Sequence, residues 1–84
     1  MTMLKTLPKP QIHDRGRGPE IKGTRITVYD ILDYYPKHHH TWIASLFRIN
    51  SDQVLAAIDY IEAHKPEVMK EYRQILAQIG RAHV

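Results

Sequence analysis

The stretch NSDQVLAAIDYIEAH, residues 50–64, decides the fold. Asn50 stands three residues before Gln53, which is the spacing of a capping box, in which each side chain accepts a hydrogen bond from the other residue's backbone amide. The apolar residues that follow recur at helical spacing and form one stripe, which consists of Val54, Ala57, Ile58 and Ile61. We therefore predict a helix that begins after this cap and runs to about His64.

Two shorter helices are predicted before it. The first covers about residues 28–35, and Pro36 ends it because the residue before a proline is pushed out of the helical region. The second covers residues 42–47, with Thr41 as its N-cap. A short turn at residues 48–50 then leads into the capped helix. This is the outline of a helix-turn-helix, although any two tightly joined helices in a small bundle share it.

A fourth helix is predicted at the end of the chain, with Pro66 in its first turn and Gly80 at its end. Its apolar stripe consists of Val68, Met69, Tyr72, Ile75, Leu76 and Ile79. Such a stripe is equally consistent with packing in the chain's own core and with docking into a groove on a partner protein. We predict the second role, with Tyr72 and Leu76 as the anchors.

The N-terminal residues favour irregular structure. Residues 1–19 hold three of the five prolines and two of the four glycines, so we expect an arm there, or a short edge strand near residues 11–13. A short strand at 20–22 and a tight turn at Gly23 follow, before a second strand or helix lead-in at 25–28.

The predicted fold is therefore mainly α: a small helix-turn-helix domain of about four helices with a short N-terminal strand pair or arm. We predict a basic flexible arm over residues 1–19, the helix-turn-helix domain over 20–65 and a partner-binding helix over 66–84.

The composition and length of the chain exclude some kinds of site and some cellular locations. The 84 residues contain no cysteine, so disulfides and thiolate metal sites are excluded. No apolar run approaches the roughly 20 residues that a membrane span needs, and we expect a cytoplasmic protein. A chain this short buries only about 60% of its unfolded surface, so its stability would gain from a partner or from dimerisation.

The charge is uneven along the chain. The net charge is +3, but residues 1–25 contain six basic and two acidic side chains and so carry +4. This excess fits either a solvated tail or a phosphate-binding surface. The helix after the turn, in contrast, carries the acidic residues Asp52, Asp59 and Glu62, which phosphates would repel. The candidates for DNA contact are therefore Arg15, Arg17, Lys22, Arg25, Arg48 and Gln53.

No set of catalytic residues emerges. Ser45 and Ser51 lack the glycine-rich elbow of a nucleophilic serine. Asp30 and Asp33 can share a helix face, but a pair of carboxylates there is usually solvated. The run of histidines at 38–40 is not completed by a cysteine or a carboxylate motif. We predict no enzymatic activity, no cofactor and no metal site.

Several motifs resemble one family over roughly residues 11–68. The main one is GPEIKGTRITV at 18–28, followed by the fitting segment YDILDY at 29–34. The smaller matches are Ile43-Ala44, Phe47, Ile49, Gln53-Val54, Ala56-Ala57-Ile58, Tyr60 and His64-Lys65-Pro66-Glu67-Val68. Together they resemble the domain-of-unknown-function family 433. The chain departs from that pattern at 36–42, where relatives usually have a glycine and then acidic residues.

The resemblance implies a small, non-enzymatic helix-turn-helix protein of the VapB antitoxin type, with Gly23, Thr24 and Arg25 as the family's signature turn. Such antitoxins are often encoded beside a PIN-like ribonuclease toxin, which they neutralise, and commonly repress their own promoter, often as dimers. We therefore expect an antitoxin that binds a ribonuclease toxin and its operator DNA, in a homodimer or a toxin-antitoxin hetero-oligomer. The alternative is a protein-interaction or assembly module that does not touch DNA.

Overall fold

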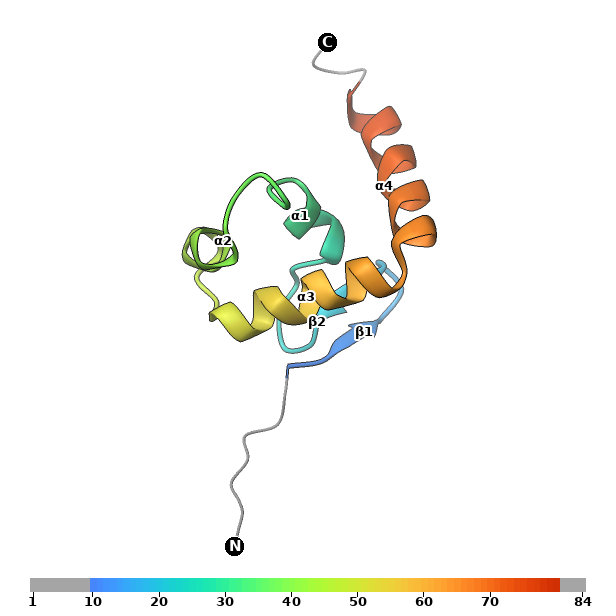
Figure 1. Ribbon diagram of the computed structural model, residues 1–84. Coiled ribbons are helices and arrows are strands. Elements are labelled where there is room, and N and C mark those ends of the chain that lie inside the picture. Colours follow the sequence, from blue (N-terminus) through green and yellow to red (C-terminus); the bar gives the residue numbers. More distant parts are fainter. Residues whose placement is uncertain (1–9, 81–84) are drawn as a thin grey trace, which may run out of the picture.

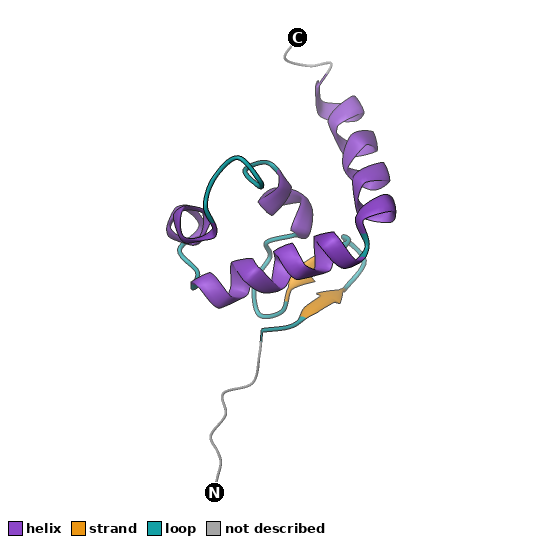
Figure 2. Cartoon of the chain, viewed as in Figure 1, coloured by secondary structure: helices purple, strands orange, loops and turns teal. Residues whose placement is uncertain are grey.

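The computed structural model describes residues 10–80, with side chains as far as Gln78. Within these residues the chain forms two strands and four helices, namely β1 (Ile12–Asp14), β2 (Pro19–Ile21), α1 (Val28–Leu32), α2 (His40–Phe47), α3 (Ser51–Ala63) and α4 (Lys65–Gly80). The predicted mainly α fold with a short N-terminal strand pair is confirmed (Figures 1 and 2).

Helix α3 lies across the middle of the domain, with α1 and α2 on one side and the strand pair on the other (Figure 1). It begins with the predicted capping box. The backbone amide of Gln53 donates to Oδ1 of Asn50, and the amide of Asn50 donates to Oε1 of Gln53, both over 2.9 Å. The buried face of α3 supplies Val54, Ala57 and Ile61 to a core that β2, α1, α2 and the start of α4 complete.

Helix α1 is shorter than predicted and ends at Leu32 rather than near Tyr35. After Leu32 the hydrogen bonds span fewer residues. The amide of Asp33 is shared between the carbonyls of Tyr29 and Asp30, and the amide of Tyr34 donates to the carbonyl of Ile31, three residues back. Such bonds are typical of a last turn that leaves the α-helical form.

Helix α2 starts one residue before Thr41, so the prediction that Thr41 is the N-cap is wrong. His39 takes that position, with an extended backbone and a ring nitrogen that accepts the amide of Thr41 over 3.2 Å. The hydroxyl of Thr41 lies 2.8 Å from the same nitrogen. A histidine ring therefore replaces the hydroxyl that usually caps a helix.

The two strands pair antiparallel, with Ile12 opposite Ile21. The loop between them is closed by Asp14, whose Oδ1 accepts the amides of Gly16 and Gly18. Gly18 has a φ of +100°, and a Cβ there would lie 2.8 Å from the ring of Tyr29, so glycine is required.

The chain after β2 turns tightly, as predicted around Gly23. The backbone amide of Thr24 donates a hydrogen bond to the carbonyl of Ile21 over 3.0 Å. The amide of Ile21 donates to the carbonyl of Ile26 over 2.9 Å. Residues 25–28 then lead into α1 rather than forming a second regular strand. Residues 12–19, part of the segment expected to be an arm, therefore consist of a strand and hydrogen-bonded loop attached to the domain.

Helix α4 leaves the body of the domain after its first turns (Figure 1). Val68 is buried in the core, and Met69 and Tyr72 pack against it. The part of α4 beyond Tyr72 extends outward.

Candidate functional site

A buried carboxylate holds the basic loop together. Glu20 on β2 has an exposed fraction of zero, and its Oε1 lies 3.4 Å from Nε of Arg15 and 3.8 Å from Nε2 of His13. Its Oε2 lies 3.4 Å from Nε of Arg17. An ionised carboxylate removed from water is costly unless cations compensate it. The two arginines supply that compensation, so both are part of the fold as well as of the surface.

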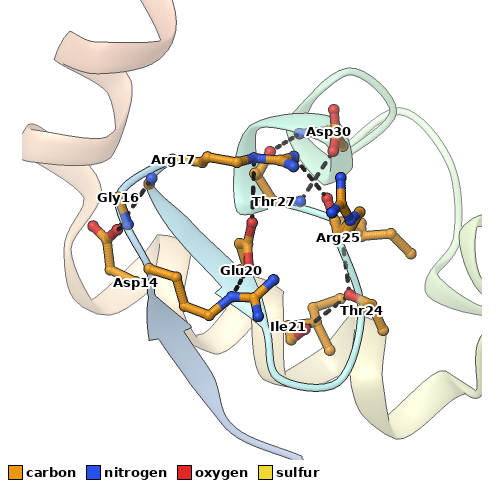
Figure 3. Close-up of polar contacts among 12 residues, drawn as sticks. Asp14, Gly16, Arg17, Glu20, Ile21, Thr24, Arg25, Thr27 and Asp30 are labelled. Carbon is orange, nitrogen blue, oxygen red and sulfur yellow. Dashed lines mark hydrogen bonds and ion pairs between the residues drawn. The ribbon is translucent and has the colours of Figure 1, made fainter.

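The arginines approach Glu20 through their Nε atoms, while their side chains stay more than half exposed. Figure 3 shows the side chain of Arg17 crossing from the loop to the next turn, where its Nη2 donates to the backbone carbonyl of Arg25 over 3.2 Å. A guanidinium carries five donors, so terminal N–H groups of Arg15 remain available on the outside.

Four of the predicted DNA-contacting residues lie in the β1–β2 loop and the turn after β2. We call this group the basic turn surface, and it consists of Arg15, Arg17, Lys22 and Arg25. All four side chains are exposed. The acidic residues nearest them in the chain are Asp14, the buried Glu20, and Asp30, which accepts the backbone amide of Thr27 at the start of α1. Four cations thus stand against three carboxylates, one of them buried, and the surface keeps a net positive charge.

A hollow in the basic turn surface is lined by Arg15, Gly23, Thr24 and Arg25. The hydroxyl of Thr24 donates to the carbonyl of Ile21 over 2.8 Å and accepts the amide of Ile26 over 3.0 Å, so it serves the turn. Gly23 has a φ of +88° and leaves open space where a Cβ would stand. A hydrogen-bonded turn and two arginines thus line the hollow.

The other two predicted DNA contacts lie elsewhere, at the turn between α2 and α3. Arg48 is exposed and ends α2 in the left-handed region, with a φ of 60°. The amide oxygen of Gln53 is occupied by the α3 cap. The nearby surface of α3 is acidic, because three of its exposed residues are Asp52, Asp59 and Glu62.

Glu62 is also engaged locally. It accepts a 2.6 Å hydrogen bond from the hydroxyl of Tyr35, which lowers the pKa of Glu62 and raises that of Tyr35. Lys65 lies 3.7 Å from its other oxygen. The exposed face of α3 is therefore poorly suited to a phosphate backbone.

The stripe predicted for partner binding divides into two halves. Val68, Met69 and Tyr72 face the domain's own core, and the hydroxyl of Tyr72 donates to Asp33 over 2.8 Å. Burial, followed by this hydrogen bond, raises the pKa of Tyr72 to about 12. Further along, Ile75 is partly exposed and Leu76 is 42% exposed. The side chain of Ile79 lies outside the described residues.

Two features of the structure were not foreseen from sequence. The burial of Glu20 could not be predicted, because an acidic residue in a short strand among arginines is expected to be exposed. On α2, Trp42 and Leu46 are 44% and 47% exposed, and Trp42 stacks on the ring of His38 with centroids 3.9 Å apart.

Among the residues that the structure describes, no three histidine, aspartate or glutamate side chains lie close enough to hold a metal ion. No helix of residues 10–80 is long and apolar enough to cross a membrane.

Comparison of the chain with protein-family models, curated proteins and solved structures found no match.

Proposed function

We propose that this protein is a cytoplasmic antitoxin of a bacterial type II toxin-antitoxin pair. In this proposal it binds and neutralises a PIN-like ribonuclease toxin and also binds operator DNA as a repressor, in a homodimer or a toxin-antitoxin hetero-oligomer. The resemblance of residues 11–68 to domain-of-unknown-function family 433 supports this reading. No catalytic step and no cofactor belongs to the proposal.

The observation that carries the proposal is the division of α4. The helix is fixed to the domain through Val68, Met69 and Tyr72, yet its end extends past the core with Ile75 partly exposed and Leu76 exposed. An amphipathic helix of this kind can place its apolar residues in a groove on another protein. The toxin would cover the side chains that the antitoxin's own core leaves exposed.

The basic turn surface supports the DNA part of the proposal. Its arginines and lysine would contact phosphates, which position a protein on DNA but do not read its sequence. Because the exposed face of α3 is acidic, we assign phosphate contact to the β1–β2 loop and the following turn rather than to α3. The proposed repressor therefore differs from one that inserts the second helix of its helix-turn-helix into the major groove.

The test is co-expression of this chain with the products of the two reading frames adjacent to its own. We expect one of them to be a ribonuclease that co-purifies with the chain and is inactive in the complex. Two neighbours without nuclease activity, or a nuclease that stays active and separate, would contradict the antitoxin assignment.

A second candidate function is a protein-interaction module that does not bind DNA. The acidic face of α3 and the exposed pair Trp42 and Leu46 favour it. A gel-shift titration over salt separates the two. Phosphate contact predicts binding that weakens steeply as salt rises, because each neutralised phosphate releases condensed counterions. The module would show no shift at low salt.

A further inference from the structure

We propose that the hollow lined by Arg15, Gly23, Thr24 and Arg25 is a discrete phosphate-binding site. This inference deepens the DNA-binding part of the proposed function, on which it rests, by placing one phosphate at one position. The two sources of such a group are the nucleic-acid backbone and free phosphate.

Arg15 is paired with a buried carboxylate and still has an exposed side chain. Its Nε lies 3.4 Å from the buried carboxylate of Glu20, while the side chain as a whole is 60% exposed. This contact is an ion pair without hydrogen-bond geometry; it restrains the guanidinium near Glu20, and the exposure of the side chain leaves terminal N–H donors free for a ligand. A restrained guanidinium loses less conformational entropy when it binds an oxyanion than a free one does.

Arg25 has a side chain that is available to a ligand. Its backbone carbonyl is fixed by Arg17, which positions the residue at the edge of the hollow. Within residues 10–78, its side chain has neither a hydrogen bond nor an ion pair. An arginine can bind phosphate through two parallel N–H donors. Arg25 can thus turn its whole guanidinium to a ligand without breaking a contact of the fold.

Space is left between the two arginines. Gly23 adds no side chain to the hollow, and its φ of +88° is unfavourable for any other residue. Thr24 is held by two hydrogen bonds inside the turn, so this part of the lining is fixed in place. Glu20 acts as a positioning residue for Arg15, because its contact is with the arginine and it is itself fully buried.

The experiment compares Arg25→Gln with Lys22→Gln. Both substitutions remove one positive charge from the basic turn surface, but Lys22 does not line the hollow. Neither side chain has an ion pair or hydrogen bond among the described residues, so both variants should fold. Inorganic phosphate is titrated at constant ionic strength, with chloride as the balancing anion, while the amide signals of Gly23 and Thr24 are followed by NMR. A labelled DNA duplex is titrated in parallel by fluorescence anisotropy.

We expect phosphate to shift both amides saturably in the full chain, with affinity at least tenfold weaker in Arg25→Gln and less than threefold weaker in Lys22→Gln. Equal weakening in both variants, or no saturable shift, would overturn the site in favour of diffuse attraction.

The duplex then identifies the source. A selective loss of duplex affinity in Arg25→Gln supports a backbone phosphate. Saturable phosphate binding without duplex binding supports free phosphate and contradicts the DNA part of the proposed function. Duplex binding that both substitutions weaken equally, without saturable phosphate binding, overturns the site but leaves the DNA part of the proposed function standing.

Discussion

The hydroxyl of Tyr72 on α4 donates a 2.8 Å hydrogen bond to Oδ1 of Asp33, the C-cap residue that follows α1. The two residues are 39 positions apart in the chain. The bond marks how far along α4 the domain's own contacts reach, because Ile75 and Leu76 beyond it are partly or largely exposed. It thereby separates the part of α4 that belongs to the fold from the part proposed to bind a partner.

The first prediction concerns this bond. Tyr72→Phe keeps the ring against the core and removes only the hydroxyl, so the free energy of unfolding should fall by about 1 kcal/mol, the usual net value of one hydrogen bond. Urea denaturation measures it. Tyr34→Phe is the matched control, because the Tyr34 ring packs against the core but its hydroxyl has no hydrogen bond within the described residues. An equal loss of unfolding free energy in the two variants would show that the bond between Tyr72 and Asp33 does not stabilise the fold.

The second prediction concerns alkaline pH. The folded-state pKa of Tyr72 is raised to about 12, above the ordinary value of 10.0, first by burial and then by its bond to Asp33. A raised pKa means that the neutral form is favoured in the folded state, so this contribution is complete below pH 10 and is lost as the pH rises toward 12. Stability measured at pH 8 and pH 11 should therefore fall more in the unsubstituted chain than in Tyr72→Phe. Tyr29 and Tyr35, whose pKa values are also raised, contribute equally to both proteins and cancel. A fall of the same size in both would contradict the role given to Tyr72.

The third prediction concerns Glu20. Replacing both Arg15 and Arg17 with glutamine leaves a buried carboxylate without its two closest cations, and we expect a loss of about 2 kcal/mol after allowing for the exposure of the arginines. Adding Glu20→Gln to that double variant removes the uncompensated charge and should recover more than half of the loss. Thermal or urea unfolding of the three proteins measures the recovery.

This cycle also affects how DNA binding is tested. Substituting Arg15 and Arg17 alone removes phosphate contacts and support for the fold together, so weaker DNA binding by such a variant is ambiguous. If the triple variant is no more stable than the double one, Glu20 does not depend on the two arginines, and the preorganisation of Arg15 loses its basis.

The fourth prediction concerns the turn between α2 and α3. Arg48 has a φ of 60°, and the left-handed region costs a residue with a Cβ roughly 1 kcal/mol or more. Arg48→Gly should therefore raise the free energy of unfolding by about 1 kcal/mol relative to Arg48→Ala, because both lack the arginine side chain but only glycine relieves the backbone. If the alanine variant is as stable as the glycine variant, the turn does not hold this conformation in solution.

The features that sequence predicted well are local. The capping box of α3 depends on two side chains three residues apart, and the tight turn at Gly23 on a glycine at a position of positive φ. The capping box and the turn both depend on residues that are neighbours in the chain, so the sequence pattern alone predicted them. The predicted N-cap of α2 was wrong for an equally local reason: the ring nitrogen of His39 accepts the backbone amide of Thr41, so the cap lies two residues before the expected one.

The features that sequence could not give depend on distant contacts. The periodicity of α4 indicated one continuous stripe, and only the contact of Tyr72 with α1 divides it. Glu20 alternates with a core residue in a short strand, which predicts an exposed side chain. Its burial follows from the coverage of β2 by the basic loop and by Thr27, with which it forms an isolated bridge. The acidity of α3 was visible in the sequence, whereas the gathering of four basic residues around one turn required the strand pairing.

The most direct test of the central claim is the affinity of two leucine variants for the ribonuclease identified by co-expression. Leu76→Ala on the end of α4 and Leu55→Ala on α3 truncate the same side chain at similar exposures, 42% and 37%. Both variants should melt like the unsubstituted chain. Leu76→Ala should lose about 2 kcal/mol of binding free energy, roughly thirtyfold in Kd, as an anchor in a partner groove does, while Leu55→Ala should bind as tightly as before. Equal affinities of the two variants, or a loss confined to Leu55→Ala, would contradict the assignment of the end of α4 to the toxin.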